Sequence, residues 1–323
     1  MITIATEGRH PVLGVLQPSS NPSELTSASL SLPVAATSVR QNSSVRIKLS
    51  TIGASVVQSW RSVIAKYPQI QNIWLTVMPD HIHGLIHVKD RLPLHLDKII
   101  ASFKAISSKS AYTALESADK LDSTHRFIAF ENSKLKLWES GFNDRIIRNP
   151  EQLQNSIAYL KDNPRRLWLR QQHAEYFAQL KVKIAGYTFN SVGNIHLLSA
   201  DRLLPVHVSS RQSEAAIQQQ IQSLIEAAEQ GVILVSPFIC EAEKTVEQAI
   251  IERNLPHVKL LENGFSQFFK PAGKAFDACV EGKLLLLAPW QHHNDWRKIS
   301  RAQCLALNQM AADICQPCSS PSN

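Results

Sequence analysis

The segment Ile73-Trp74-Leu75-Thr76-Val77-Met78-Pro79-Asp80-His81-Ile82-His83-Gly84-Leu85-Ile86-His87-Val88 decides how the first half of the chain folds. Apolar residues on both sides of a short Met-Pro-Asp turn predict two adjacent strands. Successive strand side chains alternate faces, so His81 and His83 are expected to point the same way. Two imidazoles side by side can hold one metal ion. Because two polar residues at a strand end give the same pattern, the pair needs support from the rest of the chain.

Length and composition indicate an ordinary globular protein of two domains. The chain has 323 residues, of which 44% are hydrophobic and 19% are charged. It has no run of about 18 apolar residues and no basic leader before an apolar core, so neither a membrane span nor a secretory signal is expected. All five cysteines lie in the second half and are interpreted as reduced thiols. We therefore expect a cytoplasmic protein with no membrane partner.

Positive charge is concentrated in the first half. The net charge is +7, and residues 1–180 contain 21 Lys and Arg against 14 Asp and Glu, whereas the remainder contains 13 of each. Such an excess on one domain indicates a nucleic-acid contact surface, and a basic surface that serves only solubility is the alternative.

Hydrophobic periodicity predicts the order of elements in this half. The expected order is a strand over 1–6, a flexible loop over 17–44, a helix from 51 that Pro68 ends, the His-x-His hairpin, a helix over 96–114, a mobile connection over 115–134, a strand-turn-strand over 135–149, and a helix that Asn149-Pro150 begins and Asn163-Pro164 ends.

The last of these helices carries Tyr159 and Asn163, which are four residues apart and share a face. A divalent ion on His81 and His83 would polarise a phosphate oxygen, Tyr159 could then attack the phosphorus, and Asn163 would add an oxygen ligand. Imidazole and carboxamide oxygen ligands suit Mn²⁺ or Mg²⁺ better than a metal that seeks thiolates. A half-buried helix tyrosine and a helix-end asparagine are the plainer interpretations.

Four blocks in order and spacing resemble the REP-associated tyrosine transposases of the HUH single-tyrosine superfamily. They are Met78–Gly84, Phe103-Lys104, Leu137–Asn149 and Ala158–Pro164, and the resemblance covers about residues 1–170. One departure is Asp80, where the family usually has Asn, which adds a negative charge beside the histidine pair.

The resemblance implies an α+β domain over 1–175 with a ferredoxin-like antiparallel sheet and flanking helices. It implies metal-dependent cleavage and strand transfer of single-stranded DNA at hairpin-forming repeats, through a 5′-phosphotyrosine. Tyr159 matches the nucleophile, and His81, His83 and Asn163 match the ligands of a Mg²⁺ or Mn²⁺ ion. The residues expected to contact DNA are Lys104, Arg145 and Arg148 within the blocks, and Arg165 and Arg166 after the last one.

The second half alternates strands and helices, which predicts a parallel, doubly wound α/β sheet over 182–315, followed by a disordered tail over 316–323. The order of its elements is similar to the Rossmann-like fold of the DNA-processing protein A family, which binds single-stranded DNA. Ligands of such sheets bind at the carboxyl ends of strands. The candidate ligand-binding residues there are Ser209, Arg211, Ser236, Asn263 and Gly264.

The sequence is compatible with several functions. The main interpretation is a transposase, and the alternative is a domesticated DNA-binding protein with a regulatory or structural role and no transposition. The second domain could hold substrate DNA, bind a nucleotide, or serve as a structural module that organises a homodimer. No GxGxxG or Walker pattern supports the nucleotide.

Overall fold

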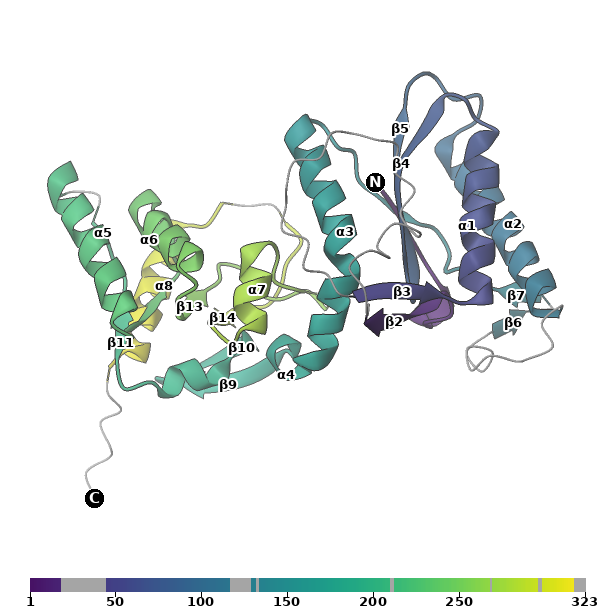
Figure 1. Cartoon of the computed structure of the whole chain (residues 1–323). Helices are drawn as coiled ribbons and strands as arrows, with labels where there is room; N and C mark the ends of the chain where they lie inside the picture. The colour runs from purple at the N-terminus through teal and green to yellow at the C-terminus, as the bar shows by residue number, and fades with distance from the viewer. Residues whose placement is uncertain are drawn as a thin grey trace. The chain divides into compact units, whose positions relative to one another are not determined.

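The computed structural model describes residues 1–18, 45–116, 129–131, 134–209, 212–267, 269–295 and 298–316. The chain divides into two compact units, Met1–Trp168 and Leu169–Asn323, and each is described by itself (Figure 1). Most of the predicted loop over 17–44, most of the predicted connection over 115–134, and the predicted tail from residue 317 lie outside the described residues. None of the described helices is long and apolar enough to cross a membrane.

The first unit is built on a four-stranded antiparallel sheet with the order β4-β5-β1-β8. Two-stranded sheets β2-β3 and β6-β7 accompany it. The elements are β1 (Ile2–Ala5), β2 (Gly14–Pro18), β3 (Val45–Leu49), α1 (Thr51–Ala65), β4 (Ile70–Met78), β5 (His81–Val88), α2 (Leu96–Glu116), β6 (Ala129–Glu131), β7 (Lys134–Lys136), β8 (Asn143–Asp144) and α3 (Pro150–Gln172). The predicted hairpin is confirmed, and so is the presence of the helices from residue 51, over 96–114 and from residue 150. Sequence reasoning missed the antiparallel pairing of β2 with β3, and the first of these strands includes Gln17 and Pro18.

Helices α1 and α2 pack against one face of this sheet (Figure 1). The face is apolar because alternate residues of three strands, including Ile4, Leu75 and Ile82, point into one core. At its centre Trp60 of α1 lies under Gly84 of β5, where a Cβ atom would collide with the indole ring. The glycine beside His83 is therefore explained by packing.

Helix α3 packs through Leu160, which is fully buried with Trp74 of β4 and Leu85 of β5. These two strand residues are cross-strand partners. Their side chains have the parity opposite to Leu75 and Ile82, so α3 covers the face that α1 and α2 leave open. The predicted helix end at Asn163-Pro164 is wrong, because α3 continues through Pro164 to Gln172.

The second unit contains a six-stranded mixed sheet with the order β11-β12-β13-β14-β10-β9. Strands β11 to β14 are parallel, whereas β10 is antiparallel to both of its neighbours. The elements are α4 (Ala174–Phe177), β9 (Leu180–Ile184), β10 (Tyr187–Gly193), β11 (Leu203–Pro205), α5 (Glu214–Glu229), β12 (Ile233–Ser236), α6 (Glu241–Glu252), β13 (His257–Leu260), α7 (Lys274–Val280), β14 (Leu284–Ala288) and α8 (Arg301–Ile314).

The predicted alternation of strands and helices is confirmed, but the doubly wound parallel sheet is not. The four parallel strands follow one another in chain order without a reversal, and antiparallel β10 and β9 close one edge. Helices α5, α6 and α7 pack on one face, and α8 packs on the other against Val235, Val258 and Leu287. The result is a helix-sheet-helix sandwich.

Candidate active site

The two histidines of β5 lie side by side, as the strand parity predicts. Their Nε2 atoms are 3.1 Å apart and their ring centroids are 4.6 Å apart. His83 is 7% exposed, so one side of the pair is shielded from solvent.

The other ring nitrogens are held by neighbouring side chains. The Nδ1 atom of His81 lies 2.6 Å from the Asp80 carboxylate, and Nδ1 of His83 lies 2.8 Å from the hydroxyl of Thr3, its cross-strand partner. Arg9 completes the arrangement, with Nη1 3.6 Å from Asp80. Such contacts fix the rotation of each ring and aim both Nε2 atoms at one point.

Charge and burial set the protonation of these groups. Burial, together with the positive charges of His81 and Arg9, lowers the pKa of His83 to about 3, so its ring is neutral near pH 7. Burial alone would raise the pKa of Asp80. The hydrogen bond with His81 and the charges of His81 and Arg9 outweigh burial and lower that pKa, so the carboxylate is ionised.

The turn that carries Asp80 is tied to the N-terminal segment. The backbone N–H and the hydroxyl of Thr6 both donate to the Asp80 carbonyl, at 2.9 and 2.8 Å, and Leu13 N–H donates to the Pro79 carbonyl at 2.9 Å. The start of β5 is therefore fixed by main-chain bonds as well as by its strand partners.

The donor set of the pair fits a divalent ion. An octahedral ion with bonds of about 2.1 Å holds neighbouring ligands about 3.0 Å apart, which is close to the observed Nε2–Nε2 separation. Where the hydrogen of the His81–Asp80 bond is carried on Nδ1 and Nε2 carries none, Nε2 of His81 offers a lone pair. If Nδ1 of His83 also donates, to Thr3, two lone pairs face each other and a cation between them removes the repulsion.

Helix α3 brings Tyr159 to this pair. The Tyr159 ring centroid is 6.3 Å from that of His83, and the side chain is 45% exposed, so its hydroxyl can be approached from solvent. Asn163 lies one turn further along α3 and is 8% exposed. The plain interpretation of Asn163 as a residue at a helix end is wrong because the helix continues. Its role as a metal ligand stays a prediction, and the described residues contain no cluster of three or more His, Cys, Asp or Glu side chains suited to a metal.

The basic residues expected to contact DNA fall into three groups. Arg145 and Arg148 line a hollow of about 460 Å³ at the N-terminal end of α3, together with Asp144, Ile146 and Gln152. On α3 itself, the guanidinium of Arg166 is 5.8 Å from the Tyr159 ring centroid, and Arg165 forms an ion pair of 3.4 Å with Asp162.

Lys104 makes internal contacts instead. Its ammonium donates to the carbonyl oxygens of Glu139, at 2.7 Å, and Gly141. Burial lowers the pKa of Lys104. A structural role in holding the loop after Trp138 accounts for this lysine, and its expected contact with DNA stays a prediction.

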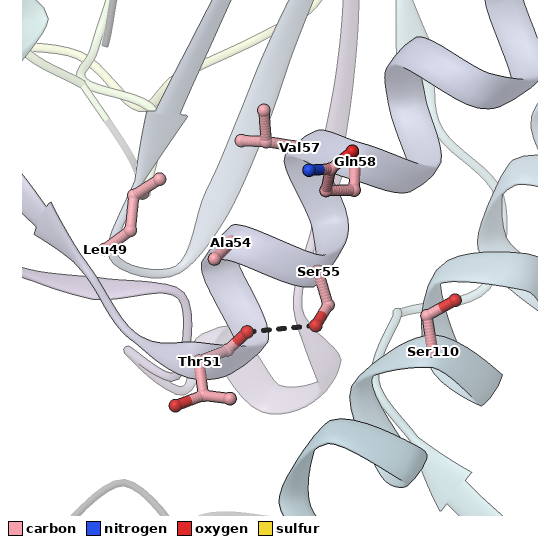
Figure 2. Close-up of a pocket in the computed structure, with 7 residues that line it drawn as sticks. All are labelled: Leu49, Thr51, Ala54, Ser55, Val57, Gln58 and Ser110. Carbon is pink, nitrogen blue, oxygen red and sulfur yellow. Dashed lines mark hydrogen bonds between the residues drawn. The ribbon is translucent and has the colours of Figure 1, made fainter. Parts of the chain in front are cut away.

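A second hollow, of about 440 Å³, lies away from the histidine pair. Figure 2 shows its lining from β3, α1 and α2, with the Ser55 hydroxyl donating to the Thr51 carbonyl at 3.0 Å within α1. Its lining residues are Leu49, Thr51, Ala54, Ser55, Val57, Gln58 and Ser110. None of these residues is a histidine, a carboxylate or a basic residue, so the hollow offers no groups for binding a metal ion or a phosphate by charge.

In the second unit, the predicted ligand-binding residues bond mainly to the protein itself. The Ser236 hydroxyl donates to Val206 O and accepts from Phe238 N, and the side chain is fully buried. Asn263 exchanges two hydrogen bonds with the backbone of His293.

The other three predicted ligand-binding residues are Gly264, Ser209 and Arg211. A Cβ atom at Gly264 would collide with the backbone of Gln291 and His292, so close approach of two loops requires this glycine. Ser209 accepts a backbone bond from Gln212, and Arg211 lies outside the described residues. A ligand at this edge of the sheet stays a prediction.

Sequence reasoning missed three residues that support the pair: Thr3, Thr76 and Arg9. Thr76 was within reach, because a two-residue Pro79-Asp80 turn places it opposite His83 in the hairpin. Thr3 and Arg9 become neighbours only through long-range pairing of β1 with β5.

Comparison with known proteins gives partial similarities. No family model matches the chain. An uncharacterized protein of Haemophilus influenzae is 25% identical over 134 residues, which is 39% of this chain and 72% of that protein.

Two solved structures of DNA processing protein A are similar to part of the chain. The protein from Helicobacter pylori, described for its single-stranded DNA binding mode, is 16% identical over 43% of this chain and 67% of its own, with a TM-score of 0.32. The protein from Streptococcus pneumoniae is 15% identical over 52% of this chain, with the same TM-score, and the match spans 60% of its length.

Proposed function

We propose that the chain binds single-stranded DNA, and that its first unit cleaves and rejoins the bound strand through a 5′-phosphotyrosine on Tyr159. The observation that carries this proposal is the meeting of an exposed tyrosine with a shielded histidine pair, at 6.3 Å between the rings of Tyr159 and His83. The basic excess of residues 1–180 supplies attraction to the phosphate backbone.

The reaction is a transesterification, in which one phosphate ester bond forms as another breaks. The phenol oxygen of Tyr159 forms a bond to phosphorus and gives up its proton, while the bond from phosphorus to the 3′ oxygen breaks and that oxygen takes a proton. A 3′-hydroxyl of another strand can reverse the step. The phosphodiester energy is kept in the tyrosyl link, so rejoining needs no ATP.

His81, His83 and Asn163 would hold the divalent ion, Mg²⁺ or Mn²⁺. When bound, the ion would withdraw electron density from a phosphate oxygen and offset negative charge in the displacement. The chain itself supplies orientation, since Asp80 and Thr3 hold the imidazoles and α3 places the Tyr159 ring beside that of His83.

Arg145 and Arg148 would hold backbone phosphates beside the start of α3, and Arg166 would hold one beside Tyr159. We further propose that the first unit is a ferredoxin-like nuclease of the HUH single-tyrosine class that acts on hairpin-forming repeats. The second unit is proposed to be a Rossmann-like module that holds DNA or organises a homodimer.

A second candidate function is DNA binding without cleavage. It is favoured by the donor set, which offers two imidazoles and one carboxamide, with no group of three or more His, Cys, Asp or Glu ligands among the described residues. Binding through arginines needs neither Tyr159 nor an ion.

One experiment separates the two candidates. The full chain is incubated with labelled single-stranded hairpin DNA and Mn²⁺ or Mg²⁺ and resolved on a denaturing gel, beside a binding measurement on the same DNA. Cleavage predicts a metal-dependent shifted band that is lost in Tyr159→Phe and His81→Ala and kept in Tyr112→Phe, a tyrosine of α2. Tight binding without a band under either metal would reject cleavage on that DNA and leave the binding function.

A further inference from the structure

Pro164 leaves a carbonyl of α3 without its helical donor. In an α-helix the N–H of residue i donates to the carbonyl of residue i−4, and proline has no N–H. The carbonyl affected is that of Leu160, whose side chain is fully buried against the sheet. A buried carbonyl without a partner is costly, so another donor is needed there.

Thr76 of β4 supplies that donor. Its hydroxyl donates to Leu160 O at 3.1 Å and accepts from the indole Nε1–H of Trp74 at 2.9 Å, and both bonds are buried. One hydroxyl therefore satisfies two groups, and its orientation is fixed by both. The bond joins the sheet to α3 at the one turn that proline has opened.

This contact lies where the proposed chemistry needs it. Thr76 is the cross-strand partner of His83, so the two side chains share a face of the sheet. Leu160 directly follows Tyr159 and precedes Asn163 by three residues. The Thr76–Leu160 bond therefore connects the turn with the nucleophile to the strand position opposite the histidine.

We propose that Thr76 is a positioning residue, which uses the carbonyl freed by Pro164 to hold Tyr159 and Asn163 at the His81–His83 pair. This inference rests on the proposed function of the first unit. Thr76 touches neither DNA nor ion in this role and acts through the placement of α3. It also gives the Asn163-Pro164 sequence a purpose other than ending a helix.

The role can be separated from stability by a pair of substitutions. Thr76→Val keeps the shape and removes the hydroxyl, so Leu160 O loses its donor. Pro164→Ala restores an N–H that can donate to Leu160 O within the helix. The double variant Thr76→Val/Pro164→Ala therefore satisfies the carbonyl again without rebuilding the link to the sheet.

The measurement is the single-turnover rate of adduct formation at saturating single-stranded DNA, together with the DNA Kd and the thermal midpoint of the full chain. Misplacement of a reacting group by about 1 Å costs roughly 100-fold in rate. We expect Thr76→Val to lower the rate by about that factor, with Kd changed less than twofold. Thr76→Ser, which keeps the hydroxyl, and Pro164→Ala alone should stay within a few-fold of the unsubstituted chain.

The double variant decides between positioning and stability. We expect its thermal midpoint to recover in part relative to Thr76→Val, because Leu160 O regains a donor while Trp74 Nε1–H still lacks its acceptor, and its rate to stay low. Thr245→Val serves as a matched control, because its hydroxyl donates to a helix carbonyl of α6 at 3.0 Å in the second unit.

Each remaining outcome is decisive. Recovery of both rate and midpoint in the double variant, or an unchanged rate in Thr76→Val, would overturn the positioning role while leaving the proposed function intact. An unsubstituted chain that binds the DNA and forms no adduct would overturn the proposed function and this inference with it.

Discussion

The packing of Trp60 beneath Gly84 makes a quantitative prediction for Gly84→Ala. The new Cβ would lie 2.5 Å from Cζ2 of Trp60, against about 3.5–4.0 Å for an ordinary carbon contact. The strand or the ring must therefore move by about 1 Å.

The indole ring has little freedom to move. Trp60 is 1% exposed, its Nε1–H donates to Asn72 Oδ1 at 3.0 Å, and its ring meets Phe103 at 5.2 Å between centroids. Overpacking of such a core costs about 1–3 kcal/mol, and the rigid surroundings place this case near 3 kcal/mol.

Hydrogen exchange of peptides from α1 and β5 measures this loss within the first unit. Trp60→Phe removes the ring atoms that the Cβ meets, so Gly84→Ala should cost only about 1 kcal/mol in that background. An equal cost in both backgrounds, or a cost below about 0.5 kcal/mol in the native background, would refute the packing argument.

Three further predictions concern charged and polar groups. Glu243 is buried and accepts hydrogen bonds from the backbone N–H groups of Val208 and Ile239. Glu243→Gln should lower the free energy of unfolding by about 2 kcal/mol and speed hydrogen exchange in the segments after β11 and β12. Unchanged exchange in these segments would contradict this role. Lys104→Met should loosen the loop after Trp138 without altering the salt dependence of DNA binding. Arg148→Gln should instead reduce the slope of the logarithm of the DNA-binding constant against the logarithm of salt concentration by about 0.7. Salt titrations of both variants check this difference. The pKa of His83 is lowered to about 3 from 6.5, so as pH falls the unfolded chain binds a proton at this residue before the folded chain does. Without metal, the free energy of unfolding should therefore decline below about pH 6.5 and be lower by about 2 kcal/mol at pH 5. Urea unfolding at pH 7.5 and 5 with a chelator should show this decline, and His83→Gln should lack it.

The sequence was most informative where strand alternation or helical spacing determines which residues share a face. Strand alternation predicted that His81 and His83 share a face, and helical spacing placed Tyr159 and Asn163 together on α3. The hairpin was readable because its turn is two residues long and both strands are apolar.

The misses have long-range causes. A proline normally ends a helix, and the Leu160 carbonyl that Pro164 leaves without a helical donor is bonded instead by Thr76, 84 residues before Leu160. Asn263 was expected at a ligand edge, but its carboxamide bonds to His293, which no local pattern shows. Strand β10 departs from the predicted parallel sheet, because an antiparallel strand beside a parallel run lacks the helix that normally marks a βα unit and so gives no local signal.

A covalent link between Tyr159 and DNA is tested most simply by finding the atom to which DNA becomes attached. The full chain is reacted with single-stranded hairpin DNA and Mn²⁺, digested with protease and nuclease, and analysed by mass spectrometry, while the released strand is tested for extension from a 3′-hydroxyl. We expect a nucleotide joined through its 5′-phosphate to the peptide that contains Tyr159, and a released strand that can be extended. Attachment at another residue, or bound DNA with no covalent product, would contradict it.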